Sequence, residues 1–145
     1  MTFNNLHDGI ECDCLEGAEV NVDSQFGRKV NKPLLRLKDF ESHWDKDRDN
    51  RPVGNCTEIC SFKAISLSKM DGENKPKVIE IFKQLFPLSP RYRPHICVIQ
   101  LGVNSGMVKA TPQENNPYHH DLYVADEFVF EEIIQVEMIP LAEDV

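Results

Sequence analysis

The sequence lacks long apolar runs, a secretory leader and a surplus of basic residues. No stretch approaches the roughly 18 to 20 apolar residues of a membrane helix, so no membrane span is predicted. The amino-terminal residues have neither the basic nor the apolar part of a signal peptide, which favours a cytoplasmic location. Only 16 Lys and Arg oppose 24 Asp and Glu, a formal net charge of −8. Because binding to phosphates needs clustered cations, extended nucleic acid is not expected as a partner.

The common motifs of nucleotide binding and hydrolysis are also missing. The sequence has no P-loop, no G-x-G-x-x-G, no G-x-S-x-G and no H-E-x-x-H. We therefore predict no cofactor. Whether the protein is an enzyme is left open by the motifs, and function has to be sought in individual side chains.

Cysteine, in contrast, is present at positions 12, 14, 56, 60 and 97. An odd number without a signal peptide indicates free thiols rather than a disulfide framework. Cys97 lies in an apolar run and is expected to be buried. As an alternative, Cys12, Cys14, Cys56 and Cys60 offer four thiolates to a zinc ion. Their C-x-C and C-x3-C spacings differ from the usual C-x2-C, so no metal site is predicted.

The length of 145 residues corresponds to one domain, and 41% hydrophobic with 28% charged residues is typical of a globular one. We expect residues 1–14 to be loosely ordered within this single domain (1–145). The pattern predicts an α+β fold, a mostly antiparallel sheet of about five strands with one or two helices packed on it.

Periodicity places the individual elements. The helices are expected at residues 33–44 and 76–86, where apolar residues recur at helical spacing. The segment 95–101 is apolar throughout and is expected to be a central strand buried on both faces. Residues 128–139 suit a strand, with a helix starting at Asp126 as the competing interpretation. Further strands are predicted at 15–22, 59–67, 107–111 and 118–124.

The segment 116–124 carries the most suggestive polar residues. In a strand, His119, Asp121 and Tyr123 share one face, because side chains alternate. A carboxylate beside an imidazole raises the pKa of the imidazole and holds its tautomer, as a general base requires. With one further ligand the same pair suits a metal. The simpler alternative is that both side chains face water on the outer side of the sheet.

Two other clusters are candidates for substrate binding. His43 and Trp44 are adjacent, and a large ring beside an imidazole suits the wall of a pocket. Arg91, Tyr92 and Arg93 place two guanidinium groups where they can clamp an anion. The competing interpretations are a core-facing tryptophan in a short helix and surface residues between a helix and a strand.

Two functional hypotheses follow. The preferred one is a small acidic protein-interaction domain, of an accessory, inhibitor or immunity type, that binds a basic protein. The alternative is a small enzyme in which His119 and Asp121 act on an anionic or nucleotide-like substrate, with or without a metal. The second hypothesis predicts that His119, Asp121 and one of the arginines converge on one concave pocket. The oligomeric state is left open.

Overall fold

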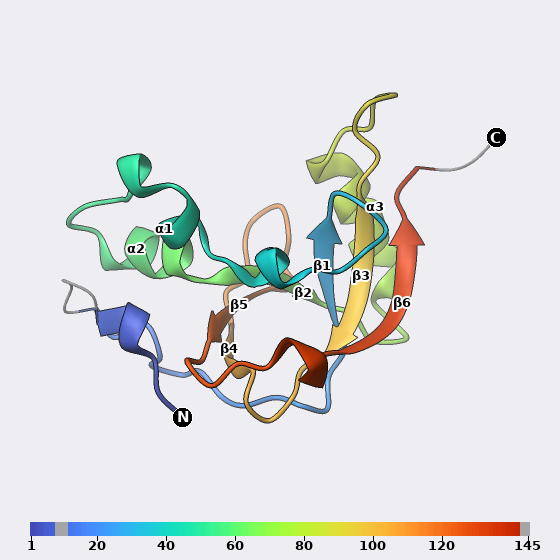
Figure 1. Ribbon diagram of the computed structural model, residues 1–145. Coiled ribbons are helices and arrows are strands. Elements are labelled where there is room, and N and C mark those ends of the chain that lie inside the picture. The colour runs from blue at the N-terminus through green and yellow to red at the C-terminus, as the bar shows by residue number, and fades with distance from the viewer. Residues whose placement is uncertain (8–11, 143–145) are drawn as a thin grey trace.

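The computed structural model describes residues 1–7 and 12–142, which form one six-stranded antiparallel sheet (Figure 1). This confirms the predicted α+β fold with a mostly antiparallel sheet. The strands follow the order β4-β5-β2-β1-β3-β6 across the sheet. Their bounds are Phe26–Val30 (β1), Ile65–Lys69 (β2), His95–Gln100 (β3), Gly106–Ala110 (β4), His119–Val124 (β5) and Ile134–Pro140 (β6).

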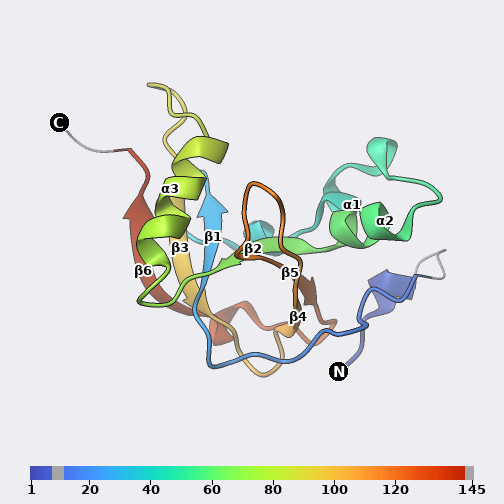
Figure 2. The same cartoon turned by 180° about the vertical axis from the view of Figure 1, so that it is seen from behind.

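Short helices cover both faces of the sheet. Seen from behind, α3 lies in front of β1 and β3 (Figure 2), and the 3-10 turns η2 and η4 lie on the opposite face (Figure 1). The helices are α1 (His43–Lys46), α2 (Cys56–Lys63) and α3 (Lys75–Leu85), and the 3-10 turns are η1 (Asn4–His7), η2 (Leu37–Phe40), η3 (Arg48–Asn50) and η4 (Phe130–Glu132).

Helix α3 confirms the helix predicted at 76–86. Pro76 occupies the first turn, where its missing N–H leaves no hydrogen bond unmade. Val78 and Phe82 lie four residues apart, so they share one face, and both are buried against the sheet. Their partners include Met70 and Ile96. Apolar packing therefore holds this helix on the β1–β3 side.

The opposite face of the sheet carries the largest apolar core. Phe40, at the end of η2, packs between Phe128 and Phe130, with ring centroids 5.0 and 6.1 Å away. Segments that lie far apart in the sequence thus pack together on this face of the sheet. The buried core residues on this side are Phe26, Val30, Leu35, Phe40, Ile65, Leu67, Cys97, Ile99, Leu101, Val108, Leu122 and Ile133.

Strands β1 and β2 diverge soon after they meet. Their register contains only two pairs, Phe26 with Lys69 and Gly27 with Ser68, whereas β1 pairs with β3 at five positions. Beyond Gly27 the Arg28 side chain spans the opening: its Nη1 donates to the carbonyl of Ser66 at 3.2 Å. The opening between the two strands is therefore lined by side chains rather than closed by a ladder of backbone hydrogen bonds.

The strand predicted at 59–67 is wrong in its first half. Residues 59–63 belong to α2, whose amino end is capped by Asn55: its side chain accepts a hydrogen bond from the Glu58 N–H at 3.2 Å. Strand β2 begins at Ile65. The apolar residues of this segment are too few and too close together to separate a short helix from a strand.

The amino-terminal part also differs from the prediction. Residues 15–22 form a turn with one isolated bridge, Glu19 to Val108, instead of a strand. The helix predicted at 33–44 is replaced by η2 and the short α1. Strand β1 was not predicted, because Arg28 and Lys29 interrupt its apolar pattern. The expected loose order of residues 1–14 falls partly on residues 8–11, which lie outside the described residues.

Two carboxy-terminal predictions have opposite outcomes. Residues 128–139 form η4 and then β6, so the helix starting at Asp126 is wrong. The segment 95–101 contains β3, a strand buried on both faces as predicted. It lies next to the edge strand β6 rather than at the centre of the sheet.

No helix in the described part of the chain is long and apolar enough to cross a membrane.

Candidate functional site

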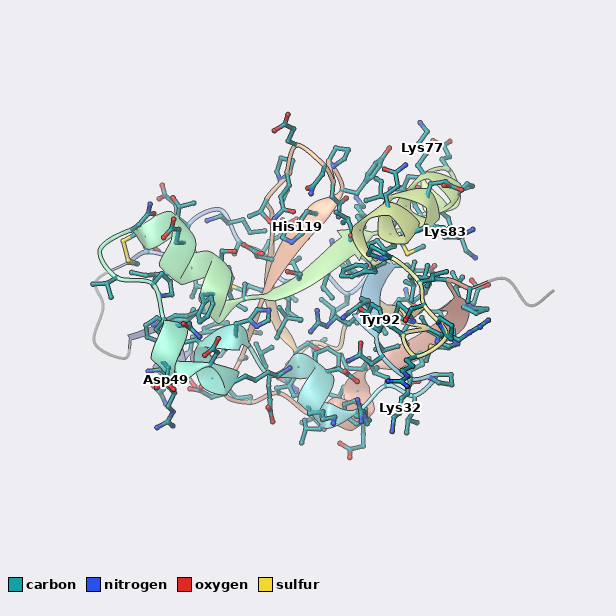
Figure 3. The ribbon with its side chains drawn as sticks, turned by 90° about the horizontal axis from the view of Figure 1, so that it is seen from above. Lys32, Asp49, Lys77, Lys83, Tyr92 and His119 are labelled. Carbon is teal, nitrogen blue, oxygen red and sulfur yellow. A yellow bond between two sulfur atoms is a disulfide. The ribbon has the colours of Figure 1, made fainter. Side chains whose placement is uncertain are left out.

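Two adjoining cavities share His119 and Gln113 in their linings. The first, here called the α2 cavity, has a volume of about 380 Å³ and is lined by Ser61, Lys109, Thr111, Asp121 and Tyr123, among others. The second, the β1–β2 cavity, has a volume of about 350 Å³ and lies at the opening between those strands. Figure 3 shows His119 between α2 and α3.

Strand β5 brings His119 and Asp121 to the cavity floor. Both point to the same face, and they are only 7% and 4% exposed. The register places Lys109 of β4 directly opposite Asp121. The alternative that His119 and Asp121 simply face water on the outer side of the sheet is therefore wrong. The predicted pair is brought together, and a cation stands beside it.

The contacts of His119 favour one tautomer of its ring. Its Nδ1 lies 3.2 Å from the Thr111 carbonyl oxygen, 2.9 Å from the Thr111 hydroxyl and 3.9 Å from Asp121 Oδ1. A carbonyl oxygen only accepts hydrogen bonds, so the contact with the Thr111 carbonyl favours a proton on Nδ1, whereas the Thr111 hydroxyl can serve either tautomer. Within residues 1–7 and 12–142, no hydrogen bond involves His119 Nε2. This arrangement leaves the Nε2 lone pair for a ligand.

Burial moves the two pKa values in opposite directions. Desolvation lowers the pKa of His119, and it outweighs the hydrogen bond to Thr111 that favours the charged ring. The sequence-based expectation of a raised pKa for His119 is therefore corrected. Desolvation raises the pKa of Asp121 to about 6, although Lys109 and Thr111 oppose the increase. At neutral pH the imidazole is neutral and the carboxylate is mostly charged.

Asp121 Oδ1 is buried and has no hydrogen-bond partner, and the same holds for Arg36 Nε, Trp44 Nε1 and His95 Nδ1 among the described residues. An unpaired buried polar atom costs about 1–3 kcal/mol, and more when it carries charge. Native proteins contain few such atoms, and a bound ligand is one way to supply the missing partner. Of the four, Asp121 Oδ1 alone belongs to a residue that lines one of the two cavities.

Lys109 and Tyr123 are two hydrogen-bond donors of the α2 cavity. Lys109 Nζ donates to the Cys14 carbonyl at 3.4 Å, which anchors the lysine at the cavity wall. Burial, followed by the nearby Asp121 charge, raises the pKa of Tyr123, so its hydroxyl keeps its proton. The cavity thus combines one neutral imidazole, the carboxylates of Asp121 and Asp13, one ammonium group and several hydroxyls.

The cysteines form two disulfides, Cys12–Cys56 and Cys14–Cys60, and Cys97 is free and buried. The prediction of free thiols is therefore wrong for four of the five, and the zinc alternative at these four is overturned as well, because disulfide sulfurs are not the thiolates that zinc binds. The burial of Cys97 is confirmed. Disulfides are typical of oxidising environments, so free thiols no longer support the predicted cytoplasmic location.

His43 and Trp44 separate in the structure. His43 lines the β1–β2 cavity, and its ring packs against Phe62 with centroids 5.6 Å apart. Trp44 is buried between Arg51 and Lys63, whose charged groups lie 4.3 and 4.5 Å from its ring centroid. Trp44 lines neither cavity, so its role is packing and cation–π contact.

Arg91 and Arg93 do not line either cavity, so the expected convergence of these arginines with His119 is wrong. They lie in the segment between α3 and β3, and both are exposed. Figure 3 shows Tyr92 apart from His119. Tyr92 reaches the β1–β2 cavity indirectly, because its hydroxyl accepts a hydrogen bond from Lys29 Nζ at 3.1 Å.

The described residues contain no group of three His, Cys, Asp or Glu side chains arranged to hold a metal ion. The chain matches no family model, no curated protein and no solved structure. A functional assignment therefore depends on the chemistry of the two cavities.

Proposed function

We propose that the protein is a small enzyme in which His119 acts as a general base on a small molecule bound across the two cavities. The buried His119–Asp121 pair, with Asp121 Oδ1 lacking a partner, is the observation that supports this proposal most. The size of the cavities supports a small-molecule ligand.

The proposed chemistry is one proton transfer. His119 Nε2 takes a proton from an acidic O–H or C–H group of the ligand, and the ring becomes an imidazolium held at Nδ1 by Thr111. The Asp121 carboxylate, 3.9 Å from Nδ1, stabilises the new positive charge. Lys109, opposite Asp121 in the register, is placed to stabilise negative charge that develops on the ligand.

A turnover screen tests the proposal. The protein is incubated with pools of small metabolites, and the depletion of each compound is followed by mass spectrometry. Loss of a general base lowers rates by about 10²–10⁴-fold, so a compound consumed by the wild type should persist with His119→Gln. His120→Gln is the matched control, because His120 is the next residue and points to the opposite face of β5. Equal turnover by His119→Gln and the wild type would reject the proposal.

The acidic interaction domain is a second candidate, favoured by strand β6. This strand is an edge of the sheet, with Ile134 and Val136 57% and 45% exposed, and it carries acidic Glu137. An open edge accepts an added strand, and the net charge of −8 favours a basic one.

The β6 hypothesis is tested with a synthetic lysine-rich β-strand peptide. We expect binding that weakens with salt and is lost in the double variant Ile134→Lys, Val136→Lys. Leu37→Lys, an equally exposed apolar position on η2, is the control. Binding that ignores both the salt concentration and the double variant would exclude this surface.

A further inference from the structure

We propose that the β1–β2 cavity binds the phosphate group of a small phosphorylated molecule and thereby places the rest of that molecule against His119. This inference rests on the proposed function, since it names the class of substrate for the same site. It starts from the opening between β1 and β2, where Arg28 crosses from one strand to the other.

The charge of this cavity is opposite to that of the whole protein. Three permanent cations, Arg28, Lys29 and Lys46, line it, and Asp39 is the single carboxylate among its lining residues. The Asp39 carboxylate is already partnered, because it accepts a hydrogen bond from the Arg36 N–H at 2.8 Å and lies 3.9 Å from Arg36 Nε. In a protein with a net charge of −8, a cavity with an excess of cations needs an explanation, and an anionic ligand supplies one.

Lys29 is held in position with a donor to spare. Its Nζ donates to Asn31 Oδ1 at 3.2 Å and to the Tyr92 hydroxyl at 3.1 Å. It also lies over the Phe86 ring, 4.9 Å from the centroid. An ammonium group has three N–H donors, so one remains for a ligand. A lysine fixed in this way loses little rotamer entropy when it binds an anion.

Arg28 is fixed in the same manner. Its Nε donates to the Asp39 carbonyl at 3.0 Å, and Nη1 donates to the Ser66 carbonyl at 3.2 Å. A guanidinium group has five N–H donors, and these two bonds leave others for a ligand. Arg28 and Lys29 come from one strand, whereas Lys46 comes from α1, so the cations reach the cavity from two elements.

One feature opposes anion binding. Phe82, Leu85 and Phe86, at the carboxyl end of α3, also line the cavity, and helix carbonyls carry partial negative charge there. The helix end is worth about half a unit charge, less than the excess of cations. Its apolar side chains form a dry wall, which strengthens the attraction between the cations and a bound anion.

The position of His119 joins the two cavities into one substrate site. Because His119 lines both, a molecule whose phosphate meets Arg28 and Lys29 extends past the imidazole toward Asp121. Each cavity has the size of a small-molecule site rather than of a polymer groove. The structure thus favours a phosphate monoester of a small polar molecule.

Binding of inorganic phosphate tests this inference by NMR titration of the amide signals. We expect the largest shifts at Arg28, Lys29 and His119. Lys29→Gln and Lys46→Gln should each weaken binding about tenfold, as expected for one charge-assisted hydrogen bond. Lys77→Gln, which removes the same charge from an exposed site pointing outward from α3 (Figure 3), should leave the affinity within about twofold.

Two outcomes would overturn the inference. One is an equal loss of affinity in Lys29→Gln, Lys46→Gln and Lys77→Gln, which would indicate attraction by net charge alone. The other is acetate binding as tightly as phosphate, which would assign the cavity to carboxylates.

Different results would reject the phosphate site and the general-base function of His119. Asp121→Asn lies outside the β1–β2 cavity, so it should bind phosphate as the wild type does and yet lose turnover. Phosphate binding without any turnover that depends on His119 would reject the enzyme and keep the phosphate site. Turnover that depends on His119, with a KM unchanged in Lys29→Gln and Lys46→Gln, would reject the phosphate site and keep the enzyme.

Discussion

The two walls that flank His119 are built in different ways. On one side α3 is held by apolar packing, with Val78 and Phe82 buried against the sheet. On the other side α2 is only eight residues long and is tied to the amino-terminal segment by the disulfides at Cys56 and Cys60. The α3 wall follows from the pattern of its sequence, whereas the α2 wall depends on covalent bonds between distant residues. The site between α2 and α3 therefore depends on both the apolar packing and the disulfides.

The largest expected effect is loss of the α2 wall. Each disulfide joins residues 44 or 46 positions apart, and a loop of that length contributes roughly 4 kcal/mol in the chain-entropy model. The double variant Cys56→Ser, Cys60→Ser should therefore lower the free energy of unfolding by at least about 4 kcal/mol in urea denaturation. Ser61→Ala, at an exposed position of α2, is the control. An unchanged midpoint would show that packing alone holds α2.

A somewhat smaller effect is expected on the α3 wall. Phe82→Ala removes a buried ring, and such truncations cost about 3–5 kcal/mol because a cavity remains. Urea denaturation with Lys77→Ala as the exposed control measures the change. A reducing agent should lower the free energy of unfolding of Phe82→Ala by the same amount as that of the wild type. Strong non-additivity would contradict independent walls.

Between the walls, Asp121 should make stability fall as the pH rises. Its pKa is about 6 in the folded protein against an ordinary 3.8, so the folded state keeps a proton that the unfolded chain has lost. The resulting loss of stability develops between about pH 4 and pH 6 and is on the order of 3 kcal/mol. Asp121→Asn should remove this pH dependence, so the free energy of unfolding of the variant should rise relative to that of the wild type across this pH range. Glu80→Gln, at an exposed position of α3, is the control and should keep the pH dependence of the wild type. Parallel curves of stability against pH for Asp121→Asn and the wild type would contradict the effect of burial on Asp121.

His119 should have the opposite dependence and a smaller effect. Its pKa is lowered below the ordinary 6.5, so the unfolded chain binds the proton more readily. The stability that this neutral ring provides is complete above pH 6.5 and is lost as the pH falls below it. His119→Gln should lose less stability than the wild type on acidification, as followed by thermal unfolding. A wild type that gains stability from His119 below pH 6.5 would contradict a lowered pKa.

Patterns of apolar residues predicted the elements that apolar packing stabilises. The periodicity of α3 and the unbroken apolar run of β3 were sufficient, because burial on one or both faces leaves a direct trace in the sequence. Strand β1 has no such apolar pattern, because Arg28 and Lys29 line the opening between β1 and β2. The disulfides were missed because the pairing of distant cysteines depends on the tertiary structure, and the cysteine count pointed the other way.

The candidate site was predicted in part. Alternation along a strand placed His119 and Asp121 on one face, and the structure has them there. Their partners Lys109 and Thr111 come from the neighbouring strand and its end, so the register of β4 with β5 was needed to find them. The lowered pKa of His119 was not predictable either, because it depends on burial that a period-two pattern does not quantify.

His119, which lines both cavities, keeps its Nε2 unprotonated for a ligand. Long-range ¹H–¹⁵N correlation spectra of the imidazole rings, with His119→Gln for assignment, measure the tautomer and the pKa directly. The proton should be found on Nδ1, with the ring neutral at pH 7 and its pKa below 6.5. A proton on Nε2, or a ring still charged at pH 7, would contradict the account.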